Sequence, residues 1–219
     1  MTNEAEELKK YLNSLRNALG ILGFLLPPST LFFNLKFGYE NPLGVLTSIS
    51  ATHYSSGYIL FEGLVLLTAG VLMCYRGYDI KDRIVTKLAG LGAILLVVFP
   101  CALEGARTWN FMMLPQGMTN TIHLASAGLF FASLVFMIAF QFTKTGEGSV
   151  IQPKSRKWRR NILYRVCAVL MVVGLAIGFG GKALFGWKYS VFAGEWVALW
   201  SFSPAWLTKG NSMPFLRDI

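Results

Sequence analysis

Residues 119–141 read TNTIHLASAGLFFASLVFMIAFQ, and residues 142–160, which follow directly, read FTKTGEGSVIQPKSRKWRR. The first stretch is apolar over close to the ~20 residues that a helix needs to cross the hydrocarbon of a membrane. The second stretch is polar, interrupted by Gly and Pro, and strongly basic. An apolar run that ends in a basic loop is typical of a transmembrane helix whose end lies in the cytoplasm.

The same pattern recurs along the chain and predicts an all-α, polytopic membrane protein. Apolar runs lie at about 17–36, 58–75, 86–103, 119–141, 161–180 and 191–207. A chain of 219 residues that is 54% hydrophobic and 14% charged is too apolar for an ordinary soluble domain. We therefore expect residues 17–210 to form one domain of six transmembrane helices. An amphipathic segment at 1–16 precedes it, and a tail at 211–219 follows it.

The distribution of Lys and Arg predicts the orientation of these helices. Fifteen of the 20 lie in the N-terminal segment, the second loop, the fourth loop at 142–160 and the tail. The first, third and fifth loops hold only Lys36, Arg107, Lys182 and Lys188. This bias places both termini, and the segments 1–16 and 211–219, in the cytoplasm. The net charge of +9 is thereby explained by orientation and by contact with anionic lipids rather than by nucleic acid. Specific binding of anionic lipid by the basic cluster at 154–160 is an alternative to orientation alone.

Three features of the apolar runs bear on packing. Pro27-Pro28 removes two amide donors and predicts a kink or break late in the first helix. Gly174 and Gly178 form a GxxxG pair, which favours close helix packing within the bundle over dimerisation. The tryptophans, Trp206 among them, are expected mostly at the membrane interfaces.

Titratable residues inside the apolar runs are the best clue to function, because charge within a membrane is costly. Glu62, His123 and Glu195 each lie about four residues into a helix that enters from the outer face. At ~1.5 Å per residue, all three should lie roughly 6 Å below the outer boundary. The outer loops add three more polar residues, His53, Glu104 and Arg107. We expect a polar cluster that faces the outside.

Three interpretations of this cluster are open. It is a structural polar network; or it binds a lipid headgroup or similar amphiphile; or it holds zinc. In the second case Arg107 contacts an anionic group, and Glu62, Glu104, His123 and Glu195 orient the polar part. In the third, His53 and His123 are metal ligands, and Glu62 or Glu104 is the general base for hydrolysis of a lipid ester or amide. No HExxH, HxxxH or CxxC spacing supports the third.

Several short motifs resemble a widespread family of uncharacterised bacterial six-helix integral membrane proteins. They span about 41–210 and include Asn41-Pro42, Thr47–Ala51, Tyr75–Asp79, Phe99-Pro100, His123 with Phe130-Phe131, Arg160–Cys167, Glu195–Phe202 and Trp206–Gly210. This resemblance implies six helices in a bacterial inner membrane and brings no established activity. More distantly, an Ile-Ser motif before the second helix and a His that opens the fourth resemble the DRAM-like and GPI-lipid-remodelling membrane proteins. The CREST superfamily of seven-helix hydrolases and receptors, which includes the alkaline ceramidases, is a looser comparison.

The resulting prediction is an inner-membrane protein that binds a lipid headgroup in an outward-facing polar cavity and needs no cofactor. A zinc-dependent intramembrane hydrolase is the enzymatic alternative. A subunit that packs on another membrane protein, or on a second copy of this chain, is the third class, because faces of small residues serve helix association equally well.

Overall fold

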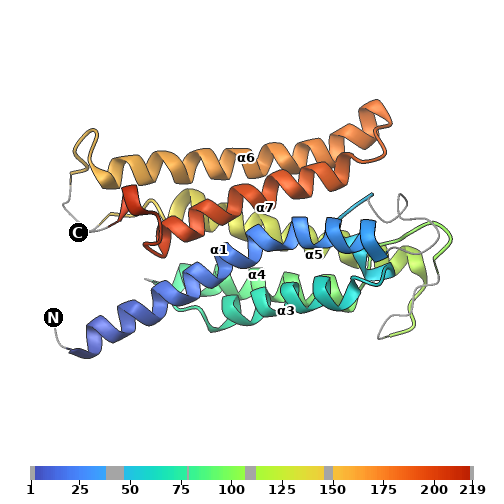
Figure 1. Ribbon diagram of the computed structural model, residues 1–219, viewed down its shortest axis with the longest axis horizontal. Coiled ribbons are helices and arrows are strands. Elements are labelled where there is room, and N and C mark those ends of the chain that lie inside the picture. The colour runs from blue at the N-terminus through green and yellow to red at the C-terminus, as the bar shows by residue number, and fades with distance from the viewer. Residues whose placement is uncertain (1–2, 38–46, 78, 107–111, 146–149, 218–219) are drawn as a thin grey trace.

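The computed structural model describes residues 3–37, 47–77, 79–106, 112–145 and 150–217, and Arg107 of the predicted cluster lies outside them. The structure is 79% helical, and the described residues contain no strand, which confirms the all-α prediction. The described residues form six α-helices, which run along the long axis of a bundle, and both termini lie at the same end (Figure 1). We call this end the terminal end and the opposite end the distal end.

Each predicted run corresponds to one helix, but the first, third and fifth helices begin earlier than predicted, and the fifth also ends later. The helices are α1 (Asn3–Phe37), α3 (Tyr58–Cys74), α4 (Ile80–Val98), α5 (Gln116–Phe136), α6 (Arg156–Phe185) and α7 (Ser190–Lys209). A π-helix, η2 (Met137–Gln141), continues α5, and two short 3₁₀ helices lie at η1 (Ser50–Tyr54) and η3 (Pro214–Leu216). The predicted segment 1–16 is not separate, since α1 runs through it. The third helix ends at Val98 instead of 103, because Pro100 restricts Phe99 to extended backbone.

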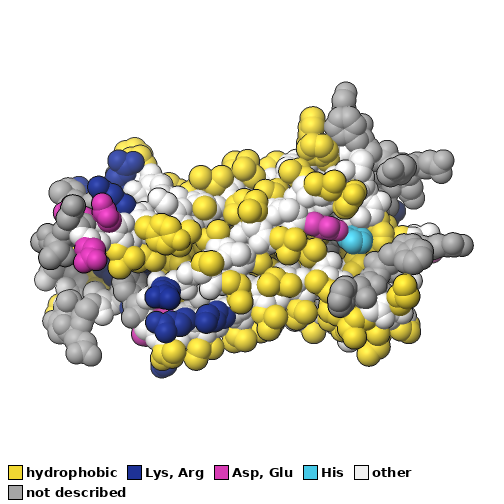
Figure 2. All heavy atoms as spheres, turned by 90° about the horizontal axis from the view of Figure 1, so that it is seen from below, with side chains coloured by type: hydrophobic (Ala, Val, Ile, Leu, Met, Phe, Trp, Pro, Cys, Tyr) yellow, Lys and Arg dark blue, Asp and Glu magenta, His cyan; other side chains and the backbone are white. Residues whose placement is uncertain are grey.

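Among the described residues, three stretches are long and apolar enough to cross a membrane: Glu4–Leu35, Gln116–Gln141 and Arg156–Phe185. The chain therefore has the character of a membrane protein. The middle of the bundle carries a largely apolar surface, and most Lys and Arg side chains on the face drawn in Figure 2 gather toward the terminal end.

Pro27 and Pro28 lie inside α1, which continues through them, so the predicted break is wrong. Pro28 has no N–H to donate to the carbonyl of Phe24, four residues earlier. The indole Nε1 of Trp200 on α7 donates to that carbonyl at 3.3 Å, and its ring stacks on the Phe24 ring. A neighbouring helix thus supplies the donor that the proline removes, as helices in lipid require.

Glycines bring α6 and α7 together. A Cβ on Gly194 of α7 would lie within 3 Å of the backbone of Gly174 and Gly178 on α6, and one on Gly174 would meet Gly194 in return. Ser190 Oγ also donates to the carbonyl of Gly178 at 3.1 Å. The GxxxG pair therefore packs within the bundle, as predicted.

The core near the terminal end is aromatic. Trp206 is fully buried and packs edge-on against the rings of Tyr75 and Phe142. Trp206, near the C-terminal end of α7, therefore packs inside the bundle and not on its surface. Its position on α7 faces α3 and the end of α5, and a large ring fills the space between three helices better than a small side chain would.

The glycine crossing predicts a sharp difference between two alanine variants. Gly194→Ala should lower the free energy of unfolding by about 1–3 kcal/mol, because its Cβ overlaps the α6 backbone. Gly70→Ala is the matched control, since a Cβ there meets nothing within 4 Å and alanine favours a helix by about 1 kcal/mol. Unfolding in detergent measures both, and equal stability of the two variants would contradict the close crossing.

The Trp200 hydrogen bond can be tested with a double-mutant cycle. Trp200→Phe keeps an aromatic ring against Phe24 but removes the donor, and should cost about 1–3 kcal/mol in the native background. In a Pro28→Ala background, the new amide at 28 can donate to Phe24, so the same change should cost clearly less. Lost ring area contributes to both arms and cancels. A coupling energy of zero would show that Trp200 does not replace the missing amide.

Candidate functional site

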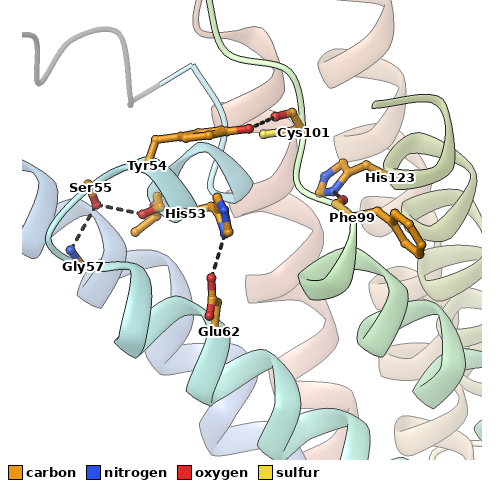
Figure 3. Close-up of polar contacts among 9 residues, drawn as sticks. His53, Tyr54, Ser55, Gly57, Glu62, Phe99, Cys101 and His123 are labelled. Carbon is orange, nitrogen blue, oxygen red and sulfur yellow. Dashed lines mark hydrogen bonds and ion pairs between the residues drawn. The ribbon is translucent and has the colours of Figure 1, made fainter. Parts of the chain in front are cut away.

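The predicted outer residues lie at the distal end, but they form two groups rather than one. His53 of η1 and Glu62 of α3 form the first group, with Nδ1 2.7 Å from Oε1 (Figure 3). Beside them, the hydroxyl of Tyr54 donates to the carbonyl of Cys101 at 2.6 Å, which ties η1 to the segment after α4. The side chains of this pair are 22% and 25% exposed, and the pair does not line the cavity described below.

His123 belongs to the second group and has a defined role for one ring nitrogen. It is buried on α5, and its Nδ1 lies 2.9 Å from the carbonyl of Phe99 (Figure 3). A carbonyl oxygen only accepts, so Nδ1 carries the proton and Nε2 is the acceptor of the neutral ring. Phe99 offers this carbonyl because α4 has just ended there.

Glu195 holds the segment before η1 against α7. Its Oε2 accepts from the backbone N–H of Ile49 at 2.5 Å, and the N–H of Phe192 donates to the carbonyl of Thr47 at 3.2 Å. A carboxylate in the first turns of α7 thus satisfies an amide of the 47–49 segment. Glu195 has a structural role, and it also lines the cavity beside it.

A cavity of about 660 Å³ opens at the distal end between α5, α6 and α7. Polar side chains line one part of it, and apolar side chains line the rest. The polar ones include Ser48, Glu104, Asn120, His123, Lys182, Lys188 and Glu195; the apolar ones include Leu124, Ala127, Phe131, Leu175, Phe179 and Val191. The cavity exists because α6 packs closely on α7 but only sparsely on α5.

The cavity also opens sideways, toward the surface of the bundle that surrounds its middle. Leu124 of α5 is 46% exposed and Phe179 of α6 is 59% exposed, although both line the cavity. Gly128 of α5 lines it as well and is exposed, and a Cβ added there would meet nothing within 4 Å. An apolar chain can therefore reach the polar part from the flank between α5 and α6.

The structure brings together three of the predicted site residues: Glu104, His123 and Glu195. Glu62 lies apart with His53, and Arg107 is not among the described residues. Sequence reasoning missed Lys182 and Lys188 as site residues. The sequence did offer a clue to them, because they are two of only four Lys or Arg in the predicted outer loops.

The described residues do not supply a metal site. No three His, Cys, Asp or Glu side chains among them lie close enough together to hold a metal ion. The two predicted zinc ligands have other partners, since His53 pairs with Glu62 and His123 donates from Nδ1 to Phe99. A catalytic zinc needs three protein ligands beside an open position. The described donor set does not fit zinc, and we derive no step through it.

No protein-family model matches the chain, and no curated protein or solved structure matches it either. Function must therefore be argued from the geometry of the distal end.

The Glu195 contact yields a prediction. Glu195→Leu leaves the N–H of Ile49 without its acceptor and should cost about 1–3 kcal/mol of stability. Glu195→Gln keeps an oxygen in place and should cost less. Unfolding in detergent compares the stability of the two variants. Hydrogen exchange of the Ile49 amide should show that this amide stays protected in the Gln variant. Equal losses for both variants would mean that charge, not the hydrogen bond, holds the loop.

Proposed function

We propose that the chain is a six-span protein of the bacterial inner membrane with both termini in the cytoplasm. An even number of antiparallel helices supports this, because it returns the C-terminus to the end where the N-terminus lies (Figure 1). α3 has 17 residues and α7 has 20, which at ~1.5 Å per residue gives about 26–30 Å, close to the hydrocarbon thickness. The excess of Lys and Arg at the terminal end favours the cytoplasmic side for it.

Within this topology, the protein binds an amphiphile with a phospholipid-like headgroup in the distal cavity. The observation that carries the proposal is the shape of the cavity: a polar part at the bundle end joined to an apolar wall that opens sideways between α5 and α6. A lipid in the outer leaflet has the same order of groups along its length. Most ligand cavities pair such apolar walls with a few placed polar groups.

The polar residues of the cavity contact different parts of the headgroup. Lys182 and Lys188 attract an anionic group of the lipid headgroup, and they take the role that the sequence suggested for Arg107. His123, with Nδ1 committed to Phe99, presents Nε2 as an acceptor for a headgroup hydroxyl or ammonium. Glu104 and Asn120 complete the polar end, and Glu195 fixes the adjacent loop. The apolar wall holds the acyl chain.

A plug in the sideways opening tests this function. Gly128→Trp places a large ring where a Cβ meets nothing, so it should fill the opening without straining the fold. Gly117→Trp on the same helix is the matched control, because its Cβ is equally unobstructed and it does not line the cavity. We expect the plug to lower retention of phospholipid about tenfold, measured by native mass spectrometry after detergent purification.

The control variant should retain phospholipid as the native chain does, and both variants should keep their thermal stability. Equal retention by the plugged and control variants would overturn lipid binding in this cavity. Co-purification of another membrane protein that only the plug disrupts would favour the subunit class instead.

A further inference from the structure

A second cavity, of about 380 Å³, lies at the terminal end, where α1, α6, the end of α7 and the segment after η2 converge. Six cationic side chains line it: Lys9, Arg16, Lys144, Lys157, Arg160 and Lys209. None of the described residues that line it is Asp or Glu. These cations come from parts of the sequence up to two hundred residues apart, so the fold, and not a local run of basic residues, collects them.

Backbone carbonyls hold two of the ammonium groups in place. Lys157 Nζ donates to the carbonyls of Phe142 at 3.3 Å and Lys144 at 2.7 Å, and Lys209 Nζ donates to the same Phe142 carbonyl at 3.4 Å. Phe142 follows η2, and a helix end leaves such carbonyls without a partner in the helix. Two lysines from different helices are therefore kept within one hydrogen bond of a single oxygen atom.

Arg16 lines this cavity and is only 7% exposed. Two of its hydrogen bonds help to orient the guanidinium: Nη1 donates to Asn13 Oδ1 at 2.9 Å, and Nε donates to the hydroxyl of Tyr75 at 3.1 Å. Orientation in the membrane does not require a buried guanidinium, because exposed cations near helix ends are enough for it. Its burial indicates a role in binding.

One carboxylate pairs with a lysine of this cavity. Asp79 pairs with Lys144 at 2.5 Å, and the Lys144 ammonium holds the pKa of Asp79 below its ordinary value. The described lining otherwise gathers basic side chains from α1, α6, α7 and the segment after η2. Several basic groups around one partly enclosed space create a positive potential that favours an anionic ligand.

We propose that the terminal-end cavity binds a phosphate group. The cavity places several Lys side chains around a buried Arg. These groups match the negative charge of phosphate and can donate hydrogen bonds to its oxygens. Leu8 and Leu12 of α1 line the rim of the cavity, so a phospholipid of the inner leaflet can place its headgroup inside and its chains along α1. A soluble phosphate compound has the same recognisable group. This site is separate from the distal cavity and does not depend on the function proposed for it.

The test compares two double variants. Lys157→Gln/Lys209→Gln removes two of the cavity ammonium groups, whereas Lys81→Gln/Arg159→Gln removes two exposed cations at the same end that do not line the cavity. Each protein is placed in nanodiscs of phosphatidylcholine with a small fraction of phosphatidic acid, and bound lipid is measured by native mass spectrometry. In a second arm, inorganic phosphate is titrated into detergent-purified protein, and the melting temperature is recorded.

The native chain should retain phosphatidic acid at least tenfold more strongly than phosphatidylcholine. In the cavity variant this preference should fall about tenfold. In the control variant it should stay within twofold of the native value. Preference for phosphatidic acid alone identifies a lipid as the ligand, and a melting temperature raised by phosphate alone identifies a soluble compound. Either result supports the phosphate site. An absence of both effects, or an equal loss in the control variant, would overturn it.

Discussion

The close crossing of α6 and α7 at glycine constrains the positions of the other helices. With Gly174, Gly178 and Gly194 at the contact, the two backbones touch, and Ser190 adds a hydrogen bond between them. α6 thereby packs closely on α7, whereas its packing on α5 and on η2 is sparse. The distal cavity is the space that this geometry leaves. A larger residue at 194 would separate the helices and change the cavity with them.

The two ends of the bundle present different chemistry to the membrane. At the distal end, carboxylates, a histidine and two lysines surround a cavity with an apolar wall. At the terminal end, cations dominate, and Arg16 is buried among them. Between the ends, the described side chains are mainly apolar, and the polar backbone freed by Pro28 is satisfied by Trp200. In the functions proposed above, the distal cavity binds a lipid of mixed polarity and the terminal-end cavity binds an anionic group.

Hydropathy predicted the number of helices because a long apolar run has few other stable forms. It predicted the helix ends less well, since the extension of α1 to Asn3 depends on polar residues, and the stop at Phe99 depends on Pro100. The shared depth of Glu62 with His123 and Glu195 was inferred from sequence spacing. Depth alone does not give the direction in which a side chain points around its helix, and Glu62 points to His53 instead. Sequence position likewise did not show that the ring of Trp206 points into the bundle.

The most direct test of the account is to find where a lipid sits on the protein. A phospholipid with a photoreactive diazirine in its acyl chain would be incorporated into membranes that contain the native chain, and the adducts mapped by mass spectrometry. The account predicts that adducts concentrate at the sideways opening, on Leu124 and Phe179, over the comparably exposed Leu67 of α3 and Val169 of α6. Equal labelling of all four positions would contradict it.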